Sequence, residues 1–151
     1  MSEETGQETR DDARVEQLSE ALPKLTPAQV AQVSSKLRRI TFEPGETIIR
    51  QGDNPDYFYI VIRGQAEVLH EGVSGRTGTV DVRRAGEYFG ETGILQNRPR
   101  NATVRASEDS EVEVLAMARE DFQAMIDDSR ATEMHVAQEM IQRLISLADA
   151  Q

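Results

Sequence analysis

The sequence predicts an α+β fold in which a barrel or jelly roll of short strands is flanked by helices. Between residues 39 and 118, short segments alternate apolar and polar residues and are separated by glycine turns at regular spacing. On either side, apolar residues recur at intervals of three and four, as they do in amphipathic helices. The length of 151 residues is that of a single domain with one hydrophobic core.

The N-terminal part predicts a tail followed by two helices. Residues 1–12 are polar and acidic without apolar periodicity, so we expect a disordered acidic tail. Residues 13–38 are predicted to be helical, with a break at Pro23. Residues 26–29, Thr-Pro-Ala-Gln, form a capping box with proline at the first helical position. The apolar positions are Val15, Leu18 and Leu22 in the first helix, and Val30, Val33 and Leu37 in the second.

The middle of the chain, residues 39–118, predicts the roll. Strands are expected at residues 40–42, 47–49, 57–62, 66–69, 79–82, around 104 and at 112–116. Turns are expected at Pro44-Gly45, Gly52-Asp53 and Gly64, and at the loop with Gly72, Gly75 and Gly78.

Residues 119–148 predict a helical C-terminal segment. A short apolar face at Phe122, Met125 and Ile126 is interrupted at residues 127–129. A longer helix follows, with an apolar stripe at Met134, Ala137, Ile141 and Leu144. Such a stripe packs against its own core, closes as a movable lid, or forms a dimer seam, and periodicity does not separate these roles.

The composition excludes several classes of function. The net charge of -10 opposes binding of a nucleic acid across the surface. The chain has no cysteine and two distant histidines, too few groups for a zinc site or a catalytic triad. No apolar run has the length of a membrane span and no signal peptide is recognisable, so we expect a cytoplasmic protein.

The charge is unevenly distributed along the chain. Residues 1–16 carry a net charge of -4 and residues 107–151 a net charge of -8, whereas residues 17–106 carry +2. Three arginines, Arg98, Arg100 and Arg105, lie within eight residues of one another. This cluster is either a solvated surface or a small anion site inside an acidic molecule, and charge alone does not decide between them.

Residues 89–104 contain a short helical stretch that is suited to an anion. Gly90 and Gly93 flank Glu91 and Thr92 at its start. A helix start that follows glycine presents free N–H groups and the positive end of the helix dipole.

Arg100 is the predicted anion-binding side chain. Pro99 fixes the backbone before it, and a guanidinium can pair with a phosphate through charge-assisted hydrogen bonds. The small Ala102 leaves room for a ligand to approach main-chain N–H groups. Glu91 cannot bind a phosphate but can accept a hydrogen bond from a sugar hydroxyl. One arginine and one carboxylate therefore describe a site for a nucleotide with a single phosphate.

The segments Phe89-Gly90-Glu91, Pro99-Arg100 and Ala102-Thr103-Val104 together resemble the phosphate-binding cassette of the cyclic nucleotide-binding domain family. Upstream, Pro44-Gly45-Glu46, Gly52-Asp53, Phe58-Tyr59-Ile60-Val61 and Gly64 follow in the family's order. The resemblance covers residues 15–148. It implies an eight-stranded, jelly-roll-like β-roll at residues 39–118 with the cassette at 89–104, and B/C-type helices at 119–148 that act as a lid.

The resemblance also implies a ligand, a cyclic 3′,5′-monophosphate. It assigns Arg100 to the cyclic phosphate and Glu91 to the ribose 2′-hydroxyl. The other implied ligand-binding residues are Gly90, Thr92, Gly93, Asn101 and Ala102, together with Val80 and Val82 as an apolar wall of the base pocket. Asn101 stands where the family usually has a small residue, and its amide can contact either base. We therefore expect cyclic AMP, with cyclic GMP as the alternative ligand.

These features predict a sensor or regulatory module and not an enzyme. We expect no catalytic residue, no metal and no cofactor other than the ligand. The expected partner is an effector, fused or associated through the C-terminal helix, or a second copy in a homodimer. One alternative is a degenerate fold that serves as a structural or interaction domain. Another is a metal-dependent enzyme of the cupin type, for which two histidines supply too few ligands.

Overall fold

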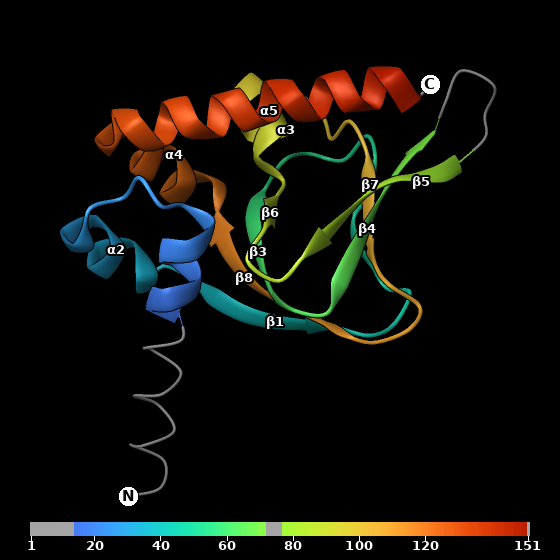
Figure 1. Cartoon of the computed structure of the whole chain (residues 1–151), viewed down its shortest axis with the longest axis horizontal. Coiled ribbons are helices and arrows are strands. Elements are labelled where there is room, and N and C mark those ends of the chain that lie inside the picture. Colours follow the sequence, from blue (N-terminus) through green and yellow to red (C-terminus); the bar gives the residue numbers. More distant parts are fainter. Residues whose placement is uncertain (1–13, 72–76, 151) are drawn as a thin grey trace, which may run out of the picture.

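The computed structural model describes residues 14–71 and 77–150 (Figure 1). The expected tail at residues 1–12 and the glycines at 72 and 75 lie outside this part of the chain. Eight strands form a roll, helices gather at one end of it, and a long helix runs along its top. The predicted α+β class, an eight-stranded roll flanked by helices, is confirmed.

The N-terminal helices begin and end close to where the sequence predicts. Residues 14–21 are helical, and α2 spans Pro27–Ser34. The Thr26 hydroxyl accepts from the Gln29 N–H at 3.2 Å, while the Thr26 N–H donates to the Gln29 side-chain oxygen at 2.9 Å. The capping box is therefore confirmed. Leu37, expected on this helix, is buried but lies beyond its end.

The eight strands form two antiparallel sheets. They are β1 (Arg38–Phe42), β2 (Thr47–Ile49), β3 (Tyr57–Arg63), β4 (Gln65–Glu71), β5 (Thr77–Arg84), β6 (Tyr88–Phe89), β7 (Thr103–Ala106) and β8 (Val112–Ala118). The sheet orders are β1-β8-β3-β6 and β2-β7-β4-β5. Gly64 joins β3 in one sheet to β4 in the other, so the chain closes the roll at this residue.

Three helices follow the strands or interrupt them. The short helix α3 (Glu91–Gln96) lies between β6 and β7, and the chain ends in α4 (Arg119–Asp128) and α5 (Arg130–Ala150). Ser129 separates α4 from α5, where the sequence predicts an interruption. Its hydroxyl donates to the Thr132 hydroxyl at 2.7 Å and accepts from the Thr132 N–H at 3.2 Å. No helix in the described ranges combines the length and apolar character that crossing a bilayer requires.

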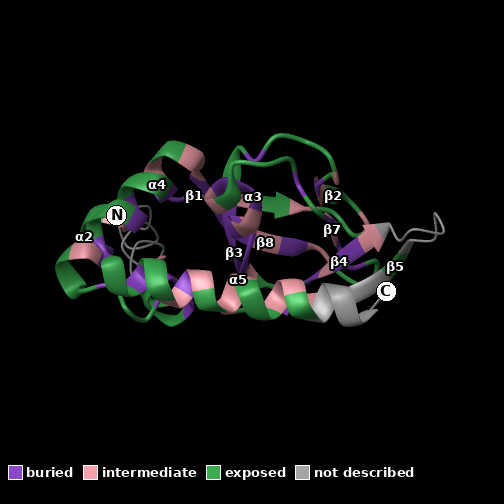
Figure 2. Cartoon of the chain, turned by 90° about the horizontal axis from the view of Figure 1, so that it is seen from above, coloured by how far each residue is buried: buried purple, intermediate pink, exposed green. Residues whose placement is uncertain are grey.

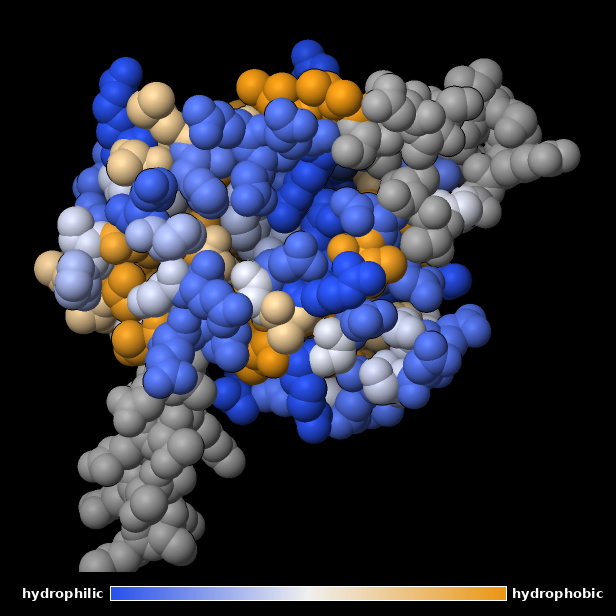
Figure 3. Space-filling view, in the orientation of Figure 1, coloured by the Kyte–Doolittle hydropathy of each residue, from blue (hydrophilic) through white to orange (hydrophobic). Residues whose placement is uncertain are grey.

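The orientation of α5 differs from the one that its apolar stripe suggests. Val136 is fully buried against the core, whereas Met134 and Ile141 are each 53% exposed. Only Leu144 of that stripe reaches the cavity beneath the helix. Figure 3 shows an apolar patch on the outer surface of α5, where Ile145 is also exposed.

The strand β3 separates two apolar clusters. Phe58 and Ile60 face the helices, and Phe58 stacks on Phe122 of α4 with ring centroids 4.6 Å apart. Tyr59 and Val61, at the alternate positions, face the interior of the roll. Figure 2 shows that burial concentrates on these inner strands, while the coloured part of α5 mixes exposed, intermediate and buried residues. The helices and the roll therefore share one strand as a common wall.

Candidate functional site

A cavity lies between the roll, α3 and α5. Seven of the nine residues that the sequence singles out for a ligand line it: Gly90, Glu91, Thr92, Gly93, Arg100, Asn101 and Ala102. The floor is apolar and includes Val68 and Val104, and α5 contributes Arg143 and Leu144 from above. The structure thus brings together a predicted segment and a helix some fifty residues further along the chain.

Arg100 is a buried cation without a contacting carboxylate among the described residues. It is 7% exposed, and its Nη1 and Nη2 donate to the carbonyl oxygens of Gly90 at 2.7 Å and Tyr57 at 2.5 Å. Burial lowers the pKa of the guanidinium, against the attraction of Tyr59 and Asp56. Two neutral carbonyls hold the group in place but leave its charge uncompensated. Such a group attracts an anion into the cavity.

The Arg100 backbone is also fixed. Its N–H donates to the Asp53 carbonyl at 2.8 Å, and its own carbonyl accepts from the Gly52 N–H at 2.9 Å. The turn that the sequence predicts at residues 52–53 therefore holds the arginine from below. Its backbone and one of its two side-chain contacts are therefore fixed by residues 43 to 48 positions upstream in the chain.

Glu91 is a buried carboxylate at the first position of α3. It is 2% exposed, and the Thr92 hydroxyl lies 3.4 Å from its Oε1. Gly90, which precedes it, has a φ of +90° that L side chains rarely adopt. An added Cβ there would lie 3.1 Å from the Tyr57 carbonyl and 3.2 Å from Arg100 Nη1. The glycine thus lets α3 start directly against the arginine.

Arg143 brings α5 into the site. Its Nη1 pairs with Glu91 Oε1 at 2.8 Å, and its Nη2 lies 3.4 Å from Glu139 Oε2 on the same helix. Its guanidinium lies over the Tyr88 ring, 4.4 Å from the ring centroid. Burial opposes the charge, but the charge and hydrogen bond of Glu91, together with Tyr88 and Glu139, outweigh burial and raise the pKa of Arg143. Burial also raises the pKa of Tyr88 far above its ordinary value.

Two further charged residues line the cavity from β5, Asp81 and Arg83. Their register explains this placement. Asp81 pairs with Val68 and Thr79 pairs with Leu69, so that Val80 has no partner on β4 and forms a bulge. From the bulge onward, Asp81 and Arg83 lie on the cavity side.

The structure gives different information on Val80 and Val82, the two valines expected to form a wall of the base pocket. Val82 pairs with Glu67 and is not among the residues that line the cavity. The side chain of Val80 lies outside the described part of the chain. The apolar surface of the cavity instead comes from residues such as Val68 and Leu144.

Arg143, Asp81 and Arg83 were missed from the sequence. One signal pointed to Arg143, which is the sole Lys or Arg between Arg130 and the end of the chain and stands next to Leu144 of the apolar stripe. For Asp81 and Arg83 no local signal exists, because the bulge that turns them inward is not visible as a pattern of residue types.

No cluster of three or more histidine or acidic side chains suited to a metal ion occurs in the described residues. His70 lies on β4 and His135 on α5. The cavity is lined by three arginines, two carboxylates and an apolar surface, a combination suited to recognition of a charged ligand.

A family model described as a cyclic nucleotide-binding domain matches residues 39–129. The chain is 38% identical over 105 residues to the cAMP-dependent protein kinase regulatory subunit of Emericella nidulans, over 70% of this chain and 24% of that protein. The chain thus spans about a quarter of the length of this curated relative.

Solved structures of similar fold are also found. The regulatory domain of Toxoplasma gondii PKA, crystallised with cAMP, matches with a TM-score of 0.80 and 26% identity, over 89% of this chain and 51% of that one. The catabolite activator protein of Thermus thermophilus matches with a TM-score of 0.71 and 28% identity, over 82% of this chain and 57% of that one.

Proposed function

Because the chain belongs to the cyclic nucleotide-binding domain family, we propose that it binds cyclic AMP in the cavity between the roll and α5. It acts as a regulatory module and not as an enzyme. The observation that carries this proposal is Arg100, a buried guanidinium whose charge no contacting carboxylate compensates within the described residues. A cyclic phosphate carries one negative charge, which would compensate the positive charge of the guanidinium.

The remaining groups fit the rest of such a ligand. Glu91 accepts from the ribose 2′-hydroxyl, and the main-chain N–H groups of Gly90, Asn101 and Ala102 add donors to the phosphate. Gly93 and Thr92 lie beside the ribose. This assignment follows the resemblance residue by residue, and the common cavity supports it.

The position of α5 links binding to regulation. Glu91 is held by Arg143 of α5, so a ribose that engages Glu91 changes the interactions of the helix. The helix then moves relative to the roll, and a partner reads its position. The exposed apolar residues of α5 are the surface that this partner contacts, whether it is an effector or a second copy of the chain.

Calorimetric titration with cyclic AMP tests the proposal. We expect saturable binding of one ligand per chain and a raised melting temperature. Amide hydrogen exchange of α5 with and without ligand tests the movement, and unchanged exchange would contradict it. If millimolar cyclic AMP and cyclic GMP produce neither heat nor a thermal shift, the fold serves as a structural or interaction domain instead.

A further inference from the structure

A groove lies between α2 and α4, at the helical end of the molecule and outside the ligand cavity (Figure 1). Its apolar lining comes from Leu25, Val33, Ala124 and Met125. The two helices are joined by Gln29 Nε2, which donates to the Asp128 carbonyl at 2.9 Å. Figure 3 shows apolar surface at this end of the molecule. This hollow, the α2/α4 groove, shares no lining residue with the ligand cavity.

The α4 wall of the groove is a single helical stripe with a carboxylate at each end. Asp121, Ala124, Met125 and Asp128 stand at positions i, i+3, i+4 and i+7, which share one face of a helix. The seven steps from Asp121 to Asp128 rise about 10 Å along the helix axis. The stripe therefore presents two negative charges about 10 Å apart, with apolar side chains between them.

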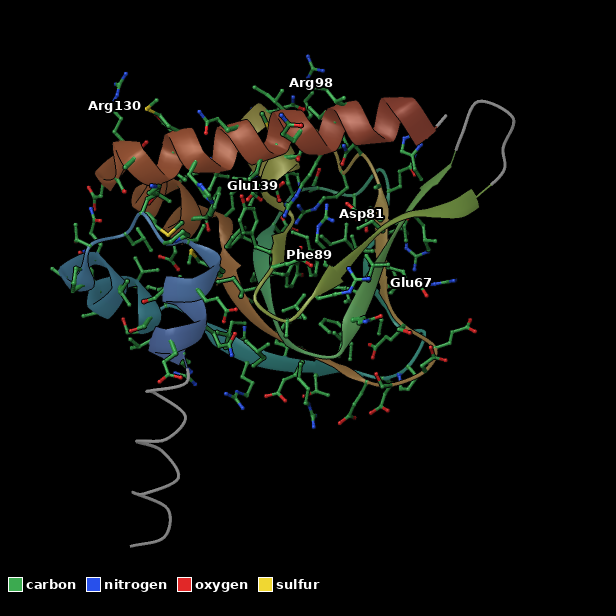
Figure 4. All side chains as sticks on the ribbon, in the orientation of Figure 1. Glu67, Asp81, Phe89, Arg98, Arg130 and Glu139 are labelled. Carbon is green, nitrogen blue, oxygen red and sulfur yellow. The ribbon has the colours of Figure 1, made fainter. Side chains whose placement is uncertain are left out.

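Neither carboxylate of the stripe pairs with a cation in the described part of the chain. Arg119 lies 3.9 Å from Glu120, Lys36 is on the opposite wall, and Figure 4 shows Arg130 pointing away from the molecule. Asp128 also stands in the last turn of α4, which has no basic residue. The negative end of the helix dipole disfavours a carboxylate there, so the helix alone does not account for this acid. A cation bound beside Asp128 would be attracted by the carboxylate and by the dipole together.

We propose that the α2/α4 groove docks a basic amphipathic helix of a partner protein. The apolar lining receives the apolar face of such a helix, and the two carboxylates receive its cations. The helix that fits carries two Lys or Arg seven positions apart, with apolar residues three and four positions after the first. On a helix these four side chains share one face, as the four residues of the α4 stripe do.

Three labelled peptides test this spacing on the whole chain. Each is an alanine-rich helix of about sixteen residues that carries two leucines and two charged residues. The matched peptide has lysines at i and i+7 and leucines at i+3 and i+4. In the second peptide both lysines are moved by two positions to the opposite face, and in the third glutamate replaces lysine. Fluorescence anisotropy should show that the matched peptide binds about fivefold or more tightly than either of the others.

Two double variants with the same change of charge test the carboxylates. Asp121→Asn with Asp128→Asn removes the two charges of the stripe, whereas Glu120→Gln with Asp127→Asn removes two charges of α4 that do not line the groove. The first should weaken binding of the matched peptide about fivefold, and the second by less than about twofold. Thermal unfolding should show no loss of stability in the first, because Asp128→Asn removes an acid from the negative end of the helix.

A bulky cation placed in the groove gives an independent test. Ala124 and Ala31 are both exposed residues of helices, but only Ala124 lines the α2/α4 groove. Ala31 lines a neighbouring hollow beside the helix at residues 14–21, which has no charged lining residue. Ala124→Arg should weaken binding of the matched peptide at least about tenfold, through bulk and repulsion, whereas Ala31→Arg should not change it.

Several results would overturn the proposal. Equal affinity for the matched and shifted peptides would do so, as would an equal loss in the two double variants. Tighter binding of the glutamate peptide would mean that an acidic partner pairs with Lys36. A loss with Ala31→Arg and not with Ala124→Arg would place the peptide in the neighbouring hollow. If no peptide binds at millimolar concentration, the groove does not dock such a helix, and cyclic nucleotide binding is unaffected by this result.

Discussion

Arg143 of α5 and Glu91 of α3 form an ion pair at 2.8 Å, although 52 residues separate them in the chain. Glu91 is almost fully buried, and the Arg143 side chain is 16% exposed. The C-terminal helix is therefore tied to the carboxylate that we assign to the ribose. Four predictions follow from this contact and its neighbours.

Arg143→Ala should destabilise the fold by about 2–4 kcal/mol, because it leaves Glu91 buried without its cation. Thermal or urea unfolding measures the loss. Arg130→Ala, on an exposed position of the same helix, is the control and should change the unfolding free energy by less than about 0.5 kcal/mol. The double variant Glu91→Gln with Arg143→Met should recover much of the loss, since it removes both charges together. A stable single variant would contradict the prediction.

Arg100→Ala should weaken cyclic AMP binding by at least about tenfold, because the charge assigned to the phosphate is lost. Arg100→Lys should not restore affinity, since one ammonium cannot reach the Gly90 and Tyr57 carbonyls together with the ligand. Arg98→Ala is the matched control: Arg98 is exposed, and Figure 4 shows it pointing away from the molecule. Calorimetry of the three variants checks this, and equal affinity of Arg100→Ala and wild type would refute the assignment.

Gly90→Ala should lower the free energy of unfolding by about 1–2 kcal/mol and should also reduce the affinity for cyclic AMP. Its φ of +90° strains an alanine, and the new Cβ meets the Tyr57 carbonyl and Arg100. Gly45→Ala separates the two causes, since Gly45 has a φ of +79° but an added Cβ there meets only an ordinary van der Waals contact at 3.7 Å. Gly78→Ala has neither the positive φ nor a close contact and should be tolerated. If Gly45→Ala weakens ligand binding as much as Gly90→Ala, the contact with Arg100 has no part in binding.

The lowered pKa of Asp81 predicts that the protein loses stability in acid. Burial opposes its ionisation, but the hydrogen bond and charge of Arg83, together with the Val82 N–H and the charge of Arg143, outweigh burial and lower the pKa of Asp81. A pKa that is lowered on folding stabilises the protein above the unfolded value, about 3.9, and this stabilisation disappears as the pH falls through the folded value. Urea unfolding at a series of pH values should therefore show a gap between wild type and Asp81→Asn that shrinks below about pH 4. A gap that persists unchanged in acid would argue against the ion pair.

The features that the sequence predicts well are local. The capping box at Thr26 involves four consecutive residues, and the break at Ser129 follows from two acids and a serine in a row. The cassette around Glu91 and Arg100 is recognisable because its glycines, acid and arginine are close together in sequence. Each of these patterns is complete within about fifteen residues.

The features that it misses depend on distant partners. The strand β6 has two residues, Tyr88 and Phe89, too few to show alternation. The orientation of α5 is set by Val136 and Arg143 against the rest of the fold, so Met134 and Ile141 point outward despite their apolar spacing. A one-residue bulge on β5 decides which side chains enter the cavity, and such a bulge arises from pairing between strands.

Because Ser129 separates α4 from α5, α5 can rotate as a rigid rod about this residue. Arg143 lies fourteen residues beyond Ser129, which is about 21 Å along a helix that rises about 1.5 Å per residue. A rotation of about 10° at Ser129 displaces the helix at Arg143 by about 4 Å. That displacement exceeds the 2.8 Å length of the Arg143–Glu91 contact. A change of a few backbone angles beside Ser129 is therefore sufficient to break or restore the ion pair at the ligand cavity.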